Sequence, residues 1–235
     1  MGERTRGLQR WLNLRGCKPA LTEDGVPGPA TRSGIIETFR NTAAPAATPA
    51  DLIQLAARLN CTVRQILAVA KVESAGGGWD DQGLLKCLYE RHYLWRRVKM
   101  AVPFLSNPSP GGYTVDADKD GINDSWEKVA DATLRFGAGF AFECASWGKF
   151  QIMGAHWKSL GYPTVLDMVW AMSRSEAAHY DAFARFIEAN GLTKALQAIN
   201  GDPENSRAFA KGYNGSGYAK YVYHLKIAAA WKTAG

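Results

Sequence analysis

Apolar residues recur at intervals of three and four along most of the chain, and this spacing constrains the fold more than any other feature. Between residues 50 and 75 it predicts helical faces formed by Leu52, Leu55, Ala56, Leu59, Ile66, Leu67, Val69, Ala70 and Val72. The helix through Ile66 must end at Gly76–Gly78. Similar spacing predicts helices over 126–144, 164–172, 175–190, 193–200 and 218–232.

Strand patterns are few. Only Leu84–Leu88 is expected to pair, in a short hairpin, and the prolines and paired glycines of residues 101–125 predict a loop. The sequence therefore predicts a mainly α fold with at most a small β-hairpin.

A stretch of small residues and proline, Asn41–Pro49, divides the chain. It holds no side chain able to anchor a core, which is typical of a semi-extended linker. We therefore expect an N-terminal domain at 1–42, a linker at 43–49 and a larger domain at 50–235.

The N-terminal segment reads as two short helices around a turn. Its first helix carries Leu8, Trp11, Leu12 and Leu14 and ends at Gly16, and its second runs from Thr31 through Ile35, Ile36 and Phe39. A unit this small has little core of its own and is not expected to be an enzyme.

Composition excludes several classes of protein. Hydrophobic residues make up 46% of the 235 residues and charged residues 21%, which excludes a disordered chain. No apolar run approaches the roughly 18 residues of a membrane-spanning helix, and the start lacks the apolar core of a signal peptide. The net charge of +6 suggests an anionic partner. Because the chain has no Lys/Arg run or nucleic-acid-binding motif, we do not expect it to bind nucleic acid.

Cysteine and histidine spacing gives no metal motif. The cysteines lack a CxxC pair and are expected to be free, buried thiols: Cys17, Cys61, Cys87 and Cys144. The histidines are scattered singly and are interpreted as structural or surface residues: His92, His156, His179 and His224.

Glu73 is the first candidate for catalysis. It follows the apolar run Ile66–Val72 and precedes Ser74 and three glycines, so it lies where a buried helix ends. Partial burial and the negative end of the helix dipole both raise a carboxyl pKa, which suits a general acid. A solvated glutamate at a helix end is the alternative.

Glu90 is a candidate second carboxylate, able to activate water or to stabilise positive charge opposite Glu73. It can equally pair with Arg91 or Arg96 as a structural bridge. Asp80 and Asp81 compete for the same role, because they follow the helix that carries Glu73.

Two strings combine aromatic rings, polar groups and glycines in the way that suits a sugar. The first is Ser146–Gly154, in which Trp147 offers a ring face, and Ser146 and Gln151 offer polar groups. The second is Tyr213–Tyr218, which begins with Tyr213 and Asn214. A Trp/Phe core helix and a plain Asn-Gly turn are the respective alternatives.

Residues 116–127 fit the full D-x-D-x-D-G-x5-E calcium loop. The ligand positions are Asp116, Asp118, Asp120, Ile122 and Glu127. Such an ion would have a structural role, because it would tie down the long loop over 101–125. A solvated acidic loop is the alternative.

Several of these motifs, in this order, resemble the N-acetylmuramidase domain of modular phage endolysins over about residues 50–232. They are Val72–Ser74, Glu90–His92, Ser146–Gly148, Phe150–Gly154 and Tyr213–Gly215. Residues 5–42 resemble a small, three-helix-type peptidoglycan-binding domain, through Leu8–Arg10 and the turn that contains Asp24, Gly25, Gly28 and Thr31. The calcium loop departs from the family pattern.

The resemblance implies a lysozyme-like α-helical enzyme, related to goose-type lysozymes, that hydrolyses the β-1,4 bond from N-acetylmuramic acid to N-acetylglucosamine. It implies Glu73 as general acid and Glu90 as the second carboxylate. It also implies a glycan cleft lined by Ser146, Trp147, Gln151, Tyr213 and Asn214. No cofactor is expected for catalysis.

A monomer is the default expectation. Because the start lacks a secretion signal, we expect the protein to accumulate in the host cytoplasm and then to act on peptidoglycan in the periplasm, without stable membrane insertion. Two alternatives stay open. One is a lytic transglycosylase with a single glutamate and 1,6-anhydro products, and the other is a non-catalytic wall-binding phage protein. The last helix carries Lys220, Lys226 and Lys232, which form either a contact with an anionic envelope or a solvated face.

Overall fold

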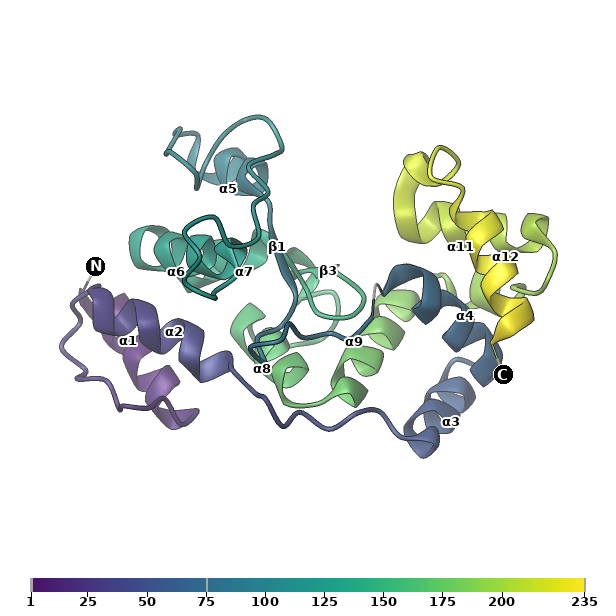
Figure 1. Cartoon of the computed structure of the whole chain (residues 1–235), viewed down its shortest axis with the longest axis horizontal. Helices are drawn as coiled ribbons and strands as arrows, with labels where there is room; N and C mark the ends of the chain where they lie inside the picture. The colour runs from purple at the N-terminus through teal and green to yellow at the C-terminus, as the bar shows by residue number, and fades with distance from the viewer. Residues whose placement is uncertain (1, 75, 235) are drawn as a thin grey trace.

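The computed structural model describes residues 2–74 and 76–234, and helices dominate them (Figure 1). In these residues the α-helices are α1 Gly2–Leu14, α2 Pro29–Phe39, α3 Pro49–Arg58, α4 Val63–Glu73, α5 Arg91–Val98, α6 Asp124–Phe136, α7 Ala138–Glu143, α8 Val165–Arg174, α9 Glu176–Ala189, α10 Thr193–Gln197, α11 Pro203–Asn214 and α12 Tyr223–Thr233. Short 3₁₀ helices are η1 Gly154–His156 and η2 Gly215–Tyr218, and the strands are β1 Cys87–Tyr89, β2 Ala145–Trp147 and β3 Ile152–Met153. The predicted mainly α fold is confirmed.

Local capping explains where the helices around Glu73 begin. Thr48 and Asp51 form a capping box at the start of α3, and Thr62 and Gln65 form another at the start of α4. The sequence predicts helical faces throughout residues 50–75 without locating this break. α4 then continues to Glu73, as expected.

Other helix boundaries differ from the sequence prediction for identifiable reasons. The expected helix over 126–144 is divided into α6 and α7 at Gly137, whose φ of +100° is incompatible with a helix. α12 begins at Tyr223 rather than at 218, because Val222 has a left-handed conformation. The sequence did not predict α5 or α11.

The sheet is antiparallel with strand order β1-β2-β3. Cys87 pairs with Trp147 and Tyr89 with Ala145, while Ser146 pairs with Met153 across a tight hairpin. The expected local pairing of Leu84–Leu88 is present in its first part, where Leu85 forms an antiparallel bridge with Trp79 and the Lys86 N–H donates to Gly78 O at 2.9 Å. The second part continues as β1, which pairs with a strand far along the chain, and a further hairpin lies at β2–β3.

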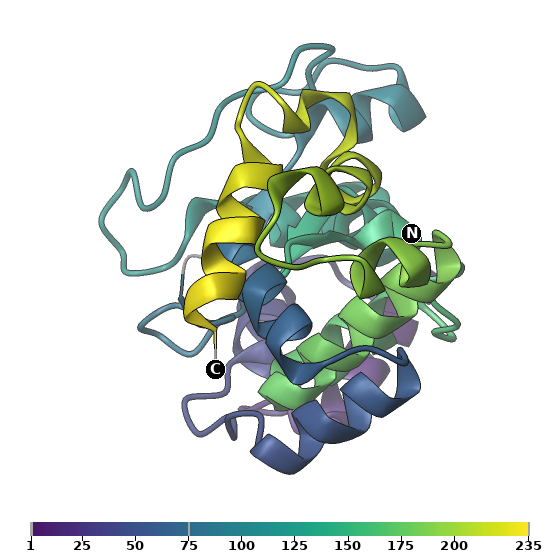
Figure 2. The ribbon, with the colours of Figure 1, turned by 90° about the vertical axis from the view of Figure 1, so that its right-hand side faces the viewer.

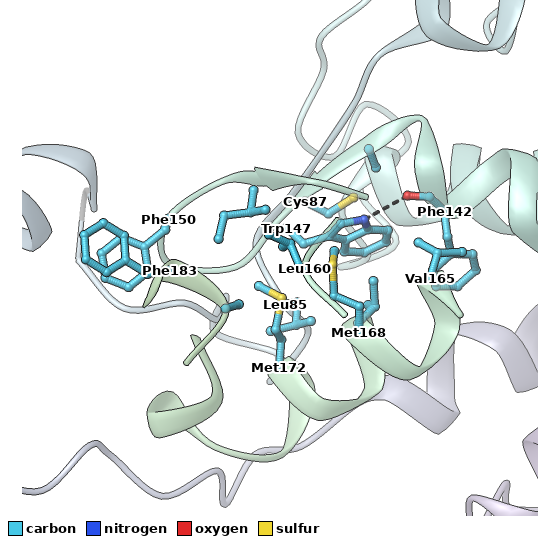
Figure 3. Close-up of a cluster of buried hydrophobic side chains, with 14 of the residues drawn as sticks. Leu85, Cys87, Phe142, Trp147, Phe150, Leu160, Val165, Met168, Met172 and Phe183 are labelled. Atoms are coloured by element: carbon cyan, nitrogen blue, oxygen red, sulfur yellow. Dashed lines mark hydrogen bonds between the residues drawn. The ribbon is translucent and has the colours of Figure 1, made fainter. Parts of the chain in front are cut away.

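The hydrophobic core surrounds this sheet (Figure 3). The Trp147 ring stacks on Phe142 with ring centroids 5.3 Å apart, and its Nε1–H donates to the Phe142 carbonyl at 2.9 Å. Phe150 and Phe183 stack at 4.5 Å and extend the core toward α9. Because α9 and the sheet share this packing, the β2–β3 hairpin is fixed relative to the helices.

The N-terminal helices pack against the rest of the chain. The Phe39 ring lies 5.4 Å from that of Trp126 and 5.3 Å from that of Phe142, and Arg32 pairs with Glu127 and Asp131 at 2.6 and 2.7 Å. Residues 2–42 contain two helices, α1 and α2, so the expected three-helix type is wrong.

The segment predicted as a linker is extended and passes beneath α8 and α9 in Figure 1. It is held by two hydrogen bonds to Glu176: Pro45 O accepts from the Glu176 N–H, and the Ala47 N–H donates to Oε2, both at 2.9 Å. The predicted extended conformation is present, and the domain boundaries stay a prediction.

The four cysteines are free, as expected, and Cys17, Cys87 and Cys144 are buried. Across residues 2–74 and 76–234, the helices are too short or too polar to span a bilayer.

Candidate active site

Glu73 is the last residue of α4 and is partly buried. Burial raises the pKa of its carboxyl, while the Asn214 side chain and the charge of Lys226 act in the opposite direction. Asn214 Nδ2 donates to Glu73 Oε1 at 3.0 Å. Within the described residues Glu73 forms no salt bridge, so its carboxyl can hold and release a proton.

Three helices position this carboxyl. α12 packs along α4, and α11 packs against α12 (Figure 2). Asn214 ends α11, where Gly215 adopts a φ of +71°. Just before it, Tyr213 stacks on Phe209 with centroids 5.5 Å apart and donates through its hydroxyl to Phe150 O at 3.2 Å. Tyr213 therefore fixes the end of α11 on the β2–β3 hairpin and aims Asn214 at Glu73.

The expected contact between Trp147 and substrate is wrong. Its side chain is completely buried in the core, where no sugar reaches it. Ser146 is buried as well, and its hydroxyl donates to Gln151 Oε1 at 2.8 Å. Gln151 is exposed at the tip of the hairpin with a φ of +48°, and its Nε2 donates to Gly148 O at 2.8 Å. Of these three residues, only Gln151 is exposed, and its contact with substrate stays a prediction.

His179 is a positioning residue that the sequence did not distinguish from the other histidines. It is fully buried, its Nδ1 accepts from the Lys149 N–H at 2.9 Å, and its Nε2 lies 2.7 Å from Met172 O. This pattern requires a neutral imidazole, and burial lowers its pKa to about 4. A Cβ at Gly78 or Gly148 would overlap the ring. His179 thus joins α9 to the β2–β3 turn and to the segment that leaves Glu73.

Glu90 is engaged by other groups. Its Oε2 accepts from the Tyr113 hydroxyl at 2.7 Å and lies 3.1 Å from His92 Nδ1. These partners belong to α5 and the following loop, and both ribbon views place α5 apart from α4 (Figures 1 and 2). In the described parts of the chain, neither the hydrogen-bond partner nor the charged neighbours of Glu73 include a second carboxylate.

Asp80 and Asp81 face the linker. Asp80 Oδ1 accepts from the Gln82 and Leu84 N–H groups at 3.0 and 2.9 Å, which fixes the turn before β1. Together with Asn41, the two aspartates line a small pocket beside the linker. Asp80 therefore stabilises this turn, and a catalytic role for either aspartate stays a prediction.

A larger pocket of about 420 Å³ lies between α1 and the α6–α7 corner. Trp11 and Phe140 give it an apolar wall, and its acidic group is Glu143. The Glu143 carboxylate is bound by Arg97 and by Trp157 Nε1. Because its acid is already paired, this pocket offers no proton donor.

The acidic loop brings carboxylates together in the way expected of a cation site. Ligand oxygens of Asp116, Asp118 and Asp120 lie within 4.8 Å of one another, and those of Asp118, Asp124 and Glu127 form a second such group. The Ile122 N–H donates to Asp120 Oδ1 at 2.8 Å. Glu127 also pairs with Arg32, so an ion at this loop would share that carboxylate with the N-terminal helices.

The residues expected to contact the wall shape the turn between α1 and α2. Asp24 Oδ1 accepts from Gln9 Nε2 at 2.8 Å, and the same amide donates to Thr31 Oγ1 at 3.1 Å. Thr31 and Gly25 are buried, and a Cβ at Gly25 would lie 2.6 Å from Gly2 O. Gly28 precedes α2 as its N-cap. Asp24, Gly28 and Thr31 also line a small pocket at this turn, so the expected contact with the wall stays a prediction.

Comparison with known proteins identifies the family. The family model described as Muramidase, N-acetylmuramidase, matches residues 62–235. Among solved structures, the chain is similar to the Burkholderia AP3 phage endolysin, with 34% sequence identity and a TM-score of 0.71 over 98% of this chain and 94% of that one. No curated protein matches. These findings make the protein a peptidoglycan-hydrolysing glycoside hydrolase of the endolysin type, and the chain belongs to the N-acetylmuramidase family.

Proposed function

We propose that the enzyme cleaves the β-1,4 bond from N-acetylmuramic acid to N-acetylglucosamine, and that Glu73 is its general acid. The proposal rests on one observation: a partly buried carboxyl at a helix end, with a raised pKa and an amide donor on one oxygen. A raised pKa keeps a larger fraction protonated near neutral pH, as proton donation to the glycosidic oxygen requires.

Asn214 has a defined part in this mechanism. As the bond breaks, an oxocarbenium-like charge develops on the sugar and Glu73 becomes a carboxylate. The Asn214 amide then donates to a fully charged oxygen, and such a hydrogen bond is stronger than one to the neutral acid. Among the other expected substrate contacts, Gln151 and Tyr213 are proposed to border the glycan, with Ser146 orienting the Gln151 amide.

The second step has two candidate forms. Hydrolysis with inversion needs a second carboxylate about 6.5–9.5 Å from the acid to activate water, and Glu90 is the proposed residue. A lytic transglycosylase needs only one glutamate, and the engagement of Glu90 by Tyr113 and His92 favours that alternative. Mass spectrometry of the released muropeptides separates the two, because only the transglycosylase gives 1,6-anhydro sugars.

The test of the proposed acid uses two matched variants on purified peptidoglycan. Glu73→Gln keeps the shape of the side chain and the contact with Asn214 but cannot donate the proton. We expect turbidity loss to slow by about 10²–10⁴-fold. Glu90→Gln should slow hydrolysis only if Glu90 activates water. A Glu73→Gln enzyme with wild-type activity would refute the assignment.

We further propose that the N-terminal helices bind the cell wall and that the chain acts as a monomer. The enzyme would accumulate in the host cytoplasm and reach the wall once the membrane is breached. A pull-down of residues 1–42 fused to a fluorescent carrier, with intact walls as the bait, tests the wall-binding role.

We also propose that the loop over 116–127 binds Ca²⁺ as a structural ion, as its motif predicts. The convergence of Asp116, Asp118 and Asp120 supports this proposal. The ion would hold the end of the long loop against the start of α6 and would have no part in the chemical step.

A further inference from the structure

The segment that leads into α12 carries an unusual group of exposed apolar side chains. Tyr221, Val222 and Leu225 are 56%, 40% and 45% exposed, whereas the aromatic rings of α9 and α11 are mainly packed inside. Lys220 Nζ lies 5.6 Å from the centroid of the Tyr221 ring, and Lys226 Nζ lies 5.3 Å from that of Tyr223. Five side chains in this segment are exposed or partly exposed and form what we call the α12 entry surface: Lys220, Tyr221, Tyr223, Leu225 and Lys226.

The backbone of this surface is strained. Val222 adopts a left-handed conformation with a φ of +53°, although it is β-branched and glycine or asparagine is the usual choice there. Such a conformation costs roughly 1–2 kcal/mol. It places Tyr221 and Tyr223 on either side of the turn, with ring centroids 6.4 Å apart. Strain of this kind is concentrated at binding sites, where it fixes side chains in advance.

The α12 entry surface adjoins Glu73. α12 packs along α4, and a groove of about 490 Å³ between them is lined by Val72, the neighbour of Glu73, and by Lys226. Electrostatics agree with this placement. The pKa of Tyr223 is raised first by burial and then by the negative charge of Glu73. The pKa of Glu73 is raised by burial, and the positive charge of Lys226 opposes that rise.

The chemistry of the surface matches one part of peptidoglycan. The apolar face of a sugar ring packs on an aromatic ring, and the stem peptides on muramic acid carry free carboxylates that attract lysine. A neutral glycan would need the tyrosines but not the lysines. Two aromatic rings, each paired with a lysine, therefore suit a sugar that bears an acidic peptide.

We propose that the α12 entry surface is a substrate subsite that binds a peptide-bearing muramic acid, with the sugar on Tyr221 and Tyr223 and the peptide carboxylates on Lys220 and Lys226. This inference rests on the proposed role of Glu73, because it places the subsite beside the scissile bond. The enzyme would accordingly prefer peptide-substituted strands to bare glycan.

Binding is measured in the Glu73→Gln background, so that substrate is not consumed. The probes are a soluble muropeptide dimer with free peptide carboxylates and a neutral N-acetylglucosamine oligomer of the same length, both titrated by calorimetry. Lys220→Ala should weaken muropeptide binding about two- to fivefold, as expected for an exposed ion pair. Binding of the neutral N-acetylglucosamine oligomer should stay the same. Tyr221→Ala should weaken binding of both probes, about two- to tenfold.

Two controls match these changes elsewhere on the surface. Lys158→Ala removes an exposed lysine from the loop after η1. Phe140→Ala removes an exposed ring on α7 that, like Tyr221, has a cation over it, with Arg97 at 5.8 Å. Neither control should change the affinity for either probe. Melting temperatures of all four variants verify that the fold is kept.

The outcomes separate this inference from the proposed function. If Lys220→Ala and Tyr221→Ala bind both probes like their controls, or if the parent variant binds no muropeptide, the subsite is wrong whatever Glu73 does. If Glu73→Gln retains lytic activity, the general-acid assignment fails, while the difference between the probes would still locate the subsite.

Discussion

Acid should destabilise this enzyme through His179, and the structure gives the size of the effect. The imidazole is fully buried and must be neutral, because its Nδ1 accepts from the Lys149 N–H. Burial lowers its pKa from 6.5 to about 4 in the folded chain. Between pH 6.5 and about pH 4, His179 is therefore protonated in the unfolded chain but neutral in the folded chain.

The sign and magnitude follow from linkage. Stability from a neutral, buried histidine is fully present above pH 6.5 and is lost progressively as the pH falls toward 4. The shift from 6.5 to about 4, at 1.36 kcal/mol per pKa unit, corresponds to about 3 kcal/mol of unfolding free energy. That is a large share of the roughly 5–15 kcal/mol typical of a folded domain.

The assay compares wild type with His179→Asn by urea denaturation at pH 7, 6, 5 and 4. An asparagine oxygen can still accept from Lys149 but does not titrate. Glu176 also titrates nearby. Burial raises the pKa of Glu176, but the Ala47 N–H and Lys149 lower it further, so that its net pKa is lowered. Because both proteins contain Glu176, its effect on the unfolding free energy cancels when they are compared. The unfolding free energy of wild type minus that of the variant should decrease by about 3 kcal/mol from pH 7 to pH 4. A constant difference would show that the reasoning about His179 is wrong.

Four further predictions follow from the same structure. Glu73→Gln should raise the melting temperature above pH 6, because a carboxyl whose pKa burial has raised destabilises the fold when it is charged; an unchanged or lower melting temperature across pH 6–9 would contradict this. Asn214→Ala removes a donor that stabilises the Glu73 carboxylate, so the alkaline limb of the pH–rate profile should move to higher pH, and a shift to lower pH would refute the role of the amide. Differential scanning calorimetry after chelation should show a rise in melting temperature when Ca²⁺ is restored, and Asp118→Asn should abolish the rise; equal melting with and without Ca²⁺ would count against the ion. Val222→Gly should stabilise the fold by about 1 kcal/mol, because glycine relieves the left-handed strain, yet weaken muropeptide binding in the Glu73→Gln background; urea denaturation and calorimetry measure the two effects, and a destabilised variant would argue against strain.

The position of Glu73 could be predicted because its signals are local. An apolar helical run that ends in a glutamate before three glycines places a partly buried carboxyl at a helix end. Asn214 was a candidate through the string Tyr213–Tyr218 and through the family resemblance, but its hydrogen bond to Glu73 needs α11, which the sequence did not predict. The tyrosines at the start of α12 were missed, although the string Tyr-Val-Tyr at a helix start is a usable signal. For His179 the sequence offers no signal.

Contacts between distant residues overturned the prediction for Trp147 and leave those for Glu90 and the N-terminal domain open. Trp147 has the composition of a sugar-binding residue, but its pairing with Cys87 across β1–β2 places it inside the core. Glu90 lies in the expected motif, yet Tyr113 and His92 hold it. The N-terminal helices read as a separate domain, and the ring of Phe39 packs on Trp126 and Phe142.

Sequence alone determined the helical class of the fold, the end of α4 and the family, because apolar spacing, capping residues and short motifs act over a few neighbouring positions. Only the tertiary structure decided which polar and aromatic side chains are buried, which carboxylates are already paired, and which surface lies beside Glu73. Those properties depend on the solvent excluded and the charges brought near by segments far away in the chain, and no local pattern contains that information.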